Sequence, residues 1–181
     1  MKIKTLIAPG FEETEAIAVI DILLRAGIEV ETVSITDKNE VEGGHKIRII
    51  ADSVISTANF NDTDGIFLPG GGTGVENLAS NAKVLNIVKD FHLKNKFIMA
   101  ICAAPFILEK AGILKNKKIT AYPSWLVKIS TPVKITTGVV VDGNIITGRA
   151  MGSSIEFGLK CIEILSGKEE SEKIKKAIVF K

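Results

Sequence analysis

Short apolar runs alternate with helix-like segments along most of this chain, and this alternation constrains the fold more than any other feature. Apolar runs of strand length predict buried strands, and apolar residues that recur every three to four positions predict helices. The predicted strands are 2–8, 28–35, 65–68 and 97–101. The predicted helices are 12–26, 82–93, 103–111 and 153–165. Strands that alternate with helices form a parallel sheet with helices on both faces, so we expect an α/β fold.

Two segments instead alternate between apolar and polar residues, as antiparallel strands do. One is 41–50, and the other is the pair 133–141 and 144–149, which is joined at Asp142-Gly143. Asp-Gly is a strong signal for the tight turn of a β-hairpin. We therefore expect a small antiparallel hairpin in addition to the parallel sheet. The charged stretch 168–176 predicts a last helix at the surface.

Length and composition indicate one globular domain over residues 1–181. Of the 181 residues, 46% are hydrophobic and 24% are charged, which is typical of a packed protein. The formal net charge is only +2, and no basic block is interleaved with aromatic residues, so we expect no nucleic-acid partner. No stretch approaches the roughly 20 apolar residues of a membrane span. The two cysteines form no disulfide pattern, so a cytoplasmic protein with reduced thiols is expected.

Three of the predicted strand-to-helix loops have unusual sequences. They are Pro-Gly-Phe-Glu-Glu-Thr-Glu at 9–15, Pro-Gly-Gly-Gly-Thr-Gly at 69–74 and Cys-Ala-Ala-Pro at 102–105. In a parallel α/β sheet such loops gather beyond the carboxyl ends of the strands, where ligands bind. We therefore expect the three loops to form one site.

Cys102 stands where a predicted strand turns sharply into a predicted helix. Such a turn projects its side chain out of the sheet, and the small Ala103 and Ala104 let the turn close, as in a nucleophile elbow. The helix start that follows at once should stabilise a thiolate. We therefore predict a reactive thiol rather than a small core residue. Cys161, within the last helix, is interpreted as a core residue.

Glu15 is predicted to be a buried acid on the apolar face of helix 12–26, whereas Glu12 and Glu13 are expected nearer solvent. Burial should raise the pKa of Glu15 so that it keeps its proton. A protonated carboxyl group that donates to the Cys102 sulfur would stabilise the thiolate, and the two groups would titrate as a coupled pair. The alternative is an acid that only complements the helix dipole.

The glycine run 70–72 lacks the Gly-Lys-Ser/Thr of a phosphate loop and does not fit G-x-G-x-x-G. Its backbone N–H groups, together with that of Ala103, suit an oxyanion better, and a flexible turn is the alternative. The two histidines, His45 and His92, precede Cys102, so neither is placed as the downstream base of a cysteine protease. The role of His45 is undetermined. No metal-ligand spacing occurs, so neither a metal nor a cofactor is expected.

Four stretches together resemble the ThiJ/PfpI superfamily. They are 9–15, Leu-Pro-Gly-Gly at 68–71, Ala-Ile-Cys-Ala-Ala-Pro at 100–105 and Gly-Arg-Ala-Met-Gly-Ser-Ser at 148–154. The resemblance covers essentially the whole chain and is closest to the branch of the parkinsonism-associated protein deglycase. It implies a flavodoxin-like three-layer sandwich related to class I glutamine amidotransferases, and a homodimer. The helix 12–26, which is apolar around most of its circumference, also predicts a partner helix.

By this resemblance, Cys102 is the reactive cysteine and Glu15 its partner, while Gly71 and Ala103 supply backbone donors beside the sulfur. Tyr122 takes the place of a histidine that many relatives have before a proline. It is a candidate for contacting substrate, with a packed aromatic as the alternative.

Arg149 lies in a matching motif and is a second candidate for contacting substrate. The resemblance implies a glutathione-independent glyoxalase or deglycase that acts on methylglyoxal or its adducts through Cys102. The alternative is a redox sensor or chaperone without turnover, in which the cysteine is oxidised to a sulfinate. The family also carries a protease or amidase label, which the missing histidine disfavours, and an older link to thiamine biosynthesis.

Overall fold

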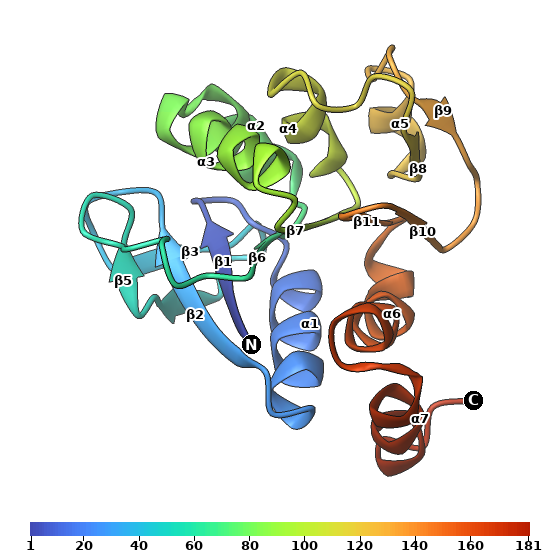
Figure 1. The fold of residues 1–181 in the computed structure, drawn as a ribbon. Coiled ribbons are helices and arrows are strands. Elements are labelled where there is room, and N and C mark those ends of the chain that lie inside the picture. The colour runs from blue at the N-terminus through green and yellow to red at the C-terminus, as the bar shows by residue number, and fades with distance from the viewer.

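A sheet of seven strands forms the centre of the computed structural model, which describes residues 1–181 (Figure 1). In spatial order the strands are β10 (Val139–Asp142), β11 (Ile145–Gly148), β7 (Phe97–Ile101), β6 (Gly65–Leu68), β1 (Lys2–Ile7), β2 (Glu29–Ser34) and β5 (Ser53–Val54). All neighbouring pairs are parallel except β10 and β11, which form an antiparallel hairpin at one edge. The predicted mostly parallel sheet is confirmed.

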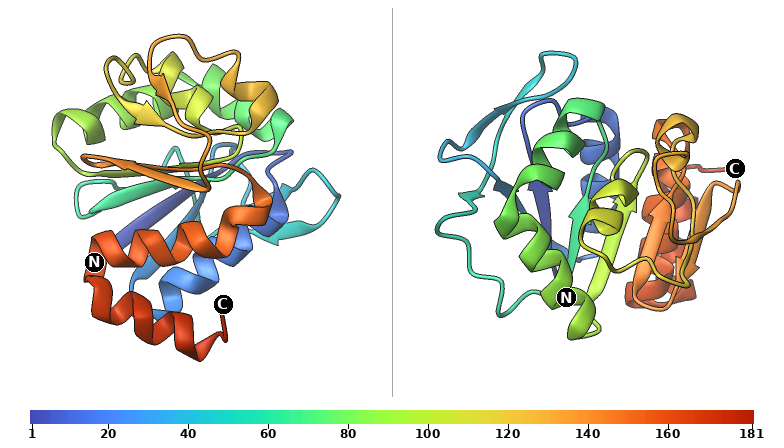
Figure 2. Two further views of the ribbon diagram at one scale, coloured as in Figure 1. Left: turned by 90° about the vertical axis from the view of Figure 1, so that its right-hand side faces the viewer. Right: turned by 90° about the horizontal axis from the view of Figure 1, so that it is seen from above.

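Helices cover both faces of this sheet and complete three layers (Figure 2). One face carries α1 (Glu13–Arg25), the short 3₁₀ turn η1 (Met151–Ser153), α6 (Ser154–Ser166) and α7 (Lys168–Ala177). The other face carries α2 (Gly72–Ser80), α3 (Ala82–Leu93), α4 (Pro105–Lys110) and α5 (Pro123–Leu126). None of these helices combines the length and the apolar character needed to cross a bilayer. The flavodoxin-like sandwich expected from the sequence is confirmed.

The central strands are apolar on both faces because both faces are covered. Ile66 and Leu68 of β6 pack with α2, α3 and α4, whereas Phe67 between them packs with α1 and α6. Strand β7 follows the same alternation. Period-two alternation between two apolar layers produces the continuous apolar runs seen in the sequence.

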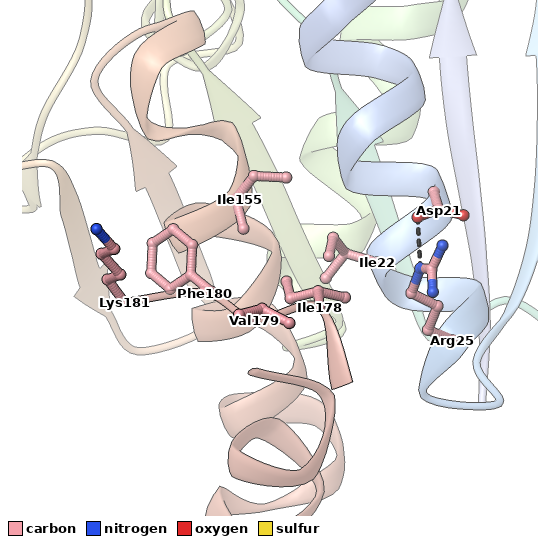
Figure 3. Close-up of a pocket in the computed structure, with 8 residues that line it drawn as sticks. All are labelled: Asp21, Ile22, Arg25, Ile155, Ile178, Val179, Phe180 and Lys181. Carbon is pink, nitrogen blue, oxygen red and sulfur yellow. Dashed lines mark hydrogen bonds and ion pairs between the residues drawn. The ribbon is translucent and has the colours of Figure 1, made fainter. Parts of the chain in front are cut away.

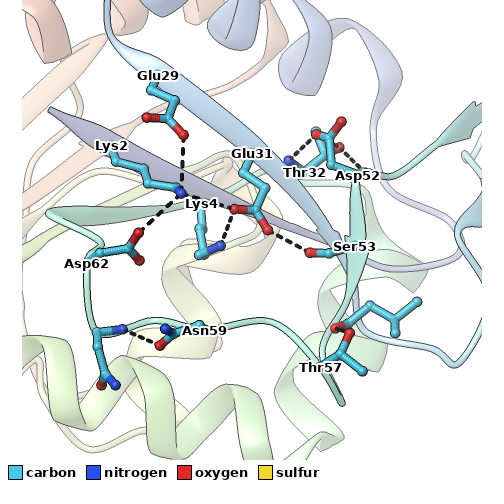
Figure 4. A network of polar contacts seen from close by, with 12 residues as sticks. Lys2, Lys4, Glu29, Glu31, Thr32, Asp52, Ser53, Thr57, Asn59 and Asp62 are labelled. Atoms are coloured by element: carbon cyan, nitrogen blue, oxygen red, sulfur yellow. Dashed lines mark hydrogen bonds and ion pairs between the residues drawn. The ribbon is translucent and has the colours of Figure 1, made fainter.

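Lys4 in the middle of β1 is the exception to this apolar pattern, since it is only 2% exposed. Its ammonium pairs with Glu31, its register partner on β2, and lies over the ring of Phe60. Ser53 donates to Glu31 at 2.7 Å, and Lys2 lies 3.6 Å from the same carboxylate (Figure 4). A buried charge is tolerated here because the carboxylate and the aromatic face compensate for its lost hydration.

The edge hairpin is shorter than the sequence indicated. The prediction that 133–141 forms one strand is wrong, because only β10 pairs with β11. The segment β9 (Val133–Lys134) pairs instead in parallel with β8 (Lys118–Ile119). The Thr120 hydroxyl, which donates to the Thr137 carbonyl at 2.9 Å, holds the chain between β9 and β10 away from the hairpin.

The other antiparallel segment, 41–50, is confirmed only in part: β3 (Glu40–Glu42) pairs with β4 (Arg48–Ile50) as a separate sheet, and residues 43–47 form the turn between them. The helix α2 was not predicted, and it begins inside the glycine run that was expected to be a loop. Its N-cap Gly71 has φ of 93°, a conformation that favours glycine. A Cβ on Gly74 would lie 2.8 Å from the Cα of Phe11, so only glycine lets α2 start against the loop after β1.

Candidate active site

Cys102 holds the sharp turn at the end of β7 that the sequence predicted. Its φ of 63° lies in the left-handed region, which is rare for a residue with a side chain. Its N–H donates to the Gly148 carbonyl at 2.9 Å, and its carbonyl accepts from the Tyr122 N–H at 2.8 Å. These two hydrogen bonds hold a strained residue at the carboxyl edge of the sheet, with its side chain half-buried.

The backbone N–H groups of Gly71 and Ala103 face the Cys102 sulfur, and both lower the pKa of the thiol and so favour its anion. The predicted stabilisation by a helix that starts directly after Cys102 is wrong in detail. The helix α4 begins only at Pro105 and has six residues. The stabilisation of the thiolate that was expected from a helix end therefore comes from individual N–H groups of the turn and of the glycine run.

Glu15 is fully buried beside the thiol, as its place on the apolar face of α1 predicted. Its carboxyl group lies next to the Cys102 thiol, which lowers the Glu15 pKa, and Oε2 accepts the Gly70 N–H at 2.9 Å. Oε1 is buried without a hydrogen-bond partner. The sequence indicated Gly70 only as one member of the glycine run 70–72, but a Cβ there would collide with Glu15 and lie 3.2 Å from the Cys102 Sγ. Only glycine can bring the backbone this close to both groups.

Burial raises the pKa of Glu15 to about 7. The hydrogen bond with Cys102 acts in the opposite direction, the charge of Glu12 raises the pKa further, and the Gly70 N–H lowers it. A carboxyl group with this pKa is close to half protonated at neutral pH. The raised pKa predicted for Glu15 is therefore present in the structure, and its cause is desolvation.

Burial also raises the pKa of the Cys102 thiol, and an ionised Glu15 raises it further through its charge and its hydrogen bond. The low thiol pKa predicted from the sequence is therefore wrong, because burial raises the pKa of Cys102 and an ionised Glu15 adds to this effect. When Glu15 keeps its proton, the repulsion disappears and its O–H can donate to the sulfur. A protonated Glu15 can thus share its proton with the sulfur, and the titration of the two groups belongs to the pair.

Glu12 and Glu13 differ in their surroundings. Glu12 caps α1, since its side chain accepts the Glu15 N–H at 2.6 Å. Glu13 was expected near solvent, but it is only 5% exposed. Its Oε1 accepts the His45 N–H at 2.6 Å, and its Oε2 lies 2.9 Å from His45 Nδ1. This pair fastens the β3–β4 turn to the start of α1 and raises the pKa of His45 through the hydrogen bond to Glu13.

Glu12, Glu13 and His45 also offer ligand atoms that lie within 4.8 Å of one another. Two carboxylates and an imidazole are a donor set that a divalent cation can use. The sequence spacing did not reveal this group, because 32 residues separate Glu13 from His45. A cation would have to displace the hydrogen bond between these two side chains.

Backbone hydrogen bonds place Tyr122 and Arg149 near Cys102: Tyr122 donates to the Cys102 carbonyl, and Gly148, which precedes Arg149, accepts the Cys102 N–H. The side chain of Tyr122 is 44% exposed, so it is not the packed aromatic of the alternative interpretation. Arg149 follows Gly148, and its guanidinium donates to the Thr136 carbonyl at 2.7 Å. Contact of either side chain with a substrate stays a prediction.

The largest cavity is elsewhere, between α1, α6 and the last residues of the chain, and its volume is about 660 Å³ (Figure 3). An ion pair of 2.6 Å between Asp21 and Arg25 stands at its rim. It is lined by Asp21, Ile22, Arg25, Ile155, Ile178, Val179, Phe180 and Lys181. None of the predicted site residues contributes to it.

Comparison with known proteins places this geometry in a family. The model of the DJ-1/PfpI family matches residues 1–164. The chain belongs to the DJ-1/PfpI family. The resemblance noted in the sequence is thereby confirmed, and the elbow cysteine with its buried glutamate is the candidate site of this family member.

Individual relatives cover the chain almost completely. Protein dj-1beta of Drosophila melanogaster is 35% identical over 177 residues, which are 96% of this chain and 94% of that protein. Protein DJ-1 homolog B of Arabidopsis thaliana is 41% identical over 172 residues, 94% of this chain, but the chain spans only 39% of its length. The chain likewise spans 44% of Arabidopsis homolog A.

Solved structures agree with this placement. The crystal structure of Drosophila DJ-1beta has a TM-score of 0.95 and 32% identity, covering 98% of this chain and 97% of that one. The structure of oxidized Toxoplasma gondii DJ-1 has a TM-score of 0.95 and 34% identity, covering 99% and 98%.

Proposed function

We propose that the protein converts α-oxoaldehydes such as methylglyoxal, or their adducts, into hydroxy acids. Cys102 is the nucleophile and Glu15 the proton carrier. The observation that carries the proposal is the burial of the Glu15 carboxyl group against the thiol, with the N–H groups of Gly71 and Ala103 at the sulfur. Membership of the DJ-1/PfpI family supports it.

The shared proton accounts for each step of such a reaction. The thiolate adds to the aldehyde carbon, and protonated Glu15 gives its proton to the alkoxide, which forms a hemithioacetal. The carboxylate then removes the proton from that carbon and returns it to the neighbouring carbon through an enediol, while the hydroxyl proton passes to the neighbouring oxygen. The product is a thioester, which water hydrolyses to free thiol and lactate. A pKa of about 7 lets Glu15 act as both acid and base.

The test is lactate formation from methylglyoxal without glutathione. Cys102→Ala should abolish it, and Glu15→Gln should lower the rate by about a hundredfold or more, as for loss of an acid–base group. Cys161→Ala is the matched control, because Cys161 is a buried core thiol and should leave the rate unchanged. Turnover that survives in Cys102→Ala, or a wild type without turnover, would contradict the proposal.

The same contacts also favour oxidation sensing as a second function. Two equivalents of hydrogen peroxide would convert the half-exposed thiol into a sulfinate and water. The N–H groups of Gly71 and Ala103, with protonated Glu15, would bind the sulfinate oxygens. A relative, Toxoplasma gondii DJ-1, has been crystallised in an oxidized form. If Cys102 gains two oxygen atoms and the protein forms no lactate, oxidation sensing would be supported and the enzymatic function would be refuted.

We propose further that two copies pair through α1. Ile17 and Leu24 are 48% and 52% exposed on this helix, while its opposite side packs on the sheet. Exposed apolar residues in register on one helix favour burial against a partner. The mass in solution tests this pairing.

A further inference from the structure

Two aromatic rings and two ammonium groups lie close together: Phe106 and Lys110 come from α4, Trp125 from α5, and Lys128 from the residues just after α5. Figure 1 shows these two helices on the same face of the sheet. The rings of Phe106 and Trp125 meet edge to face, with centroids 5.3 Å apart. The Lys128 ammonium lies 3.9 Å from the centre of the Trp125 ring, and that of Lys110 lies 5.1 Å from the centre of the Phe106 ring. Each ammonium is therefore positioned by a cation–π contact.

This group is joined to the Cys102 site on two sides. The backbone N–H of Tyr122 donates to the Cys102 carbonyl, and the backbone N–H of Trp125 donates to the Tyr122 carbonyl at 2.9 Å. These two bonds connect the start of α5 to the turn at Cys102. On the other side, the Cζ2 of Trp125 lies 3.7 Å from the position that a Cβ on Gly72 would occupy. Gly72 directly follows Gly71, whose N–H faces the sulfur. The indole therefore lies beside the glycine run whose Gly71 N–H faces the Cys102 sulfur.

The two ammonium groups carry uncompensated charge. Neither Lys110 nor Lys128 takes part in any of the ion pairs of the structure, and both side chains are exposed. The acid next in sequence to Lys110 is Glu109, and its carboxylate already accepts hydrogen bonds from Ser130 and Thr131. Two positive charges without an ion-pair partner thus remain beside the Phe106 and Trp125 rings.

We propose that Phe106, Lys110, Trp125 and Lys128 form a subsite for the anionic end of the substrate. It would take a carboxylate carried beyond the α-oxoaldehyde group, with the apolar middle of the molecule against the two rings. This inference rests on the proposed function and names the class of its substrate: aryl or extended α-oxoaldehydes that bear a negative charge. Methylglyoxal itself carries no charged group that the subsite could bind.

Kinetics with a matched substrate pair test the subsite. Wild type should have a higher kcat/KM for 4-carboxyphenylglyoxal than for phenylglyoxal, and the preference should shrink as salt is added. The double variant Lys110→Gln, Lys128→Gln should raise KM for the carboxylated substrate by about three- to tenfold and leave phenylglyoxal unchanged, as expected for two exposed charge pairs. Lys89→Gln, at an exposed position of α3, is the control for net charge and should change neither. Equal effects on both substrates, or the same effect in the control, would overturn the subsite.

A binding measurement separates failure of the subsite from failure of the enzyme. Trp125 is the only tryptophan, so its fluorescence reports on the subsite without turnover. Titration with 4-(hydroxymethyl)benzoate, which has no reactive carbonyl, should give a saturable signal that weakens in the double lysine variant. Binding that is absent, or equal for neutral 1,4-benzenedimethanol, would refute the subsite, whereas binding in a protein that forms no lactate would refute only the proposed reaction.

Discussion

Replacing Glu15 by glutamine should remove a large pH dependence of stability. The carboxyl group is fully buried, and its pKa rises from an ordinary value of about 4.5 to about 7 on folding. Because the folded pKa is the higher one, the stabilising contribution is complete below the unfolded pKa and is lost as pH rises through 7. A shift of about 2.5 units corresponds to about 3 kcal/mol, at about 1.4 kcal/mol per unit. The wild type should thus lose about 3 kcal/mol relative to Glu15→Gln between about pH 4.5 and pH 8.

Urea unfolding of both proteins at several pH values in this interval measures the difference directly. The unfolding free energy of Glu15→Gln minus that of the wild type should increase as pH rises. Most of this increase should come below and around pH 7. Glu76→Gln, at an exposed position of α2, is the control, and its stability should run parallel to that of the wild type. Parallel curves for Glu15→Gln and wild type would show that Glu15 ionises as it does in solution, and the account of the site would be wrong.

Three further changes follow from other parts of the structure. Glu31→Ala should lower the unfolding free energy by about 3 kcal/mol in urea, because it leaves the buried Lys4 ammonium unpaired; a loss below about 1 kcal/mol would contradict the importance of this pair. Gly70→Ala should cost about 1 to 3 kcal/mol and abolish thiol reactivity, since its methyl group collides with Glu15, whereas Gly152→Ala, which has open space, should change neither. Leu24→Glu should convert a dimer into a stable monomer by light scattering, and an unchanged mass would refute pairing through α1.

The strands and the elbow could be predicted because their signals are local. Apolar runs of strand length fix β1, β6 and β7, and the helical spacing of apolar residues places Glu15 on the buried face of α1. The loops then meet at one edge because the sheet is parallel. Nothing more than sequence order and residue type is needed for that inference.

The errors arose where distant residues decide the outcome. The segment 133–138 alternates like a strand, but its pairing with β8 and the bond from Thr120 to Thr137 take it out of the hairpin. Glu13 was expected near solvent because it is charged and lies near a helix start. It is buried because His45, 32 residues further along the chain, covers it. A single sequence does not record either contact.

The thiol pKa was predicted in the wrong direction for a related reason. The sequence indicates which groups meet, but the sign of their interaction depends on which of them holds the proton. An ionised Glu15 raises the pKa of Cys102, and a protonated one stabilises the thiolate. The coupling follows from the geometry of the pair and not from either residue alone.

The rate of Cys102 alkylation by iodoacetamide as a function of pH tests the shared proton most directly. Mass spectrometry separates Cys102 from the fully buried Cys161. We expect a first rise in rate centred near pH 7, where the pair loses its first proton, and the loss of this rise in Glu15→Gln. A single rise at about pH 8.5 or above, as for an ordinary cysteine, and unchanged by Glu15→Gln, would contradict it.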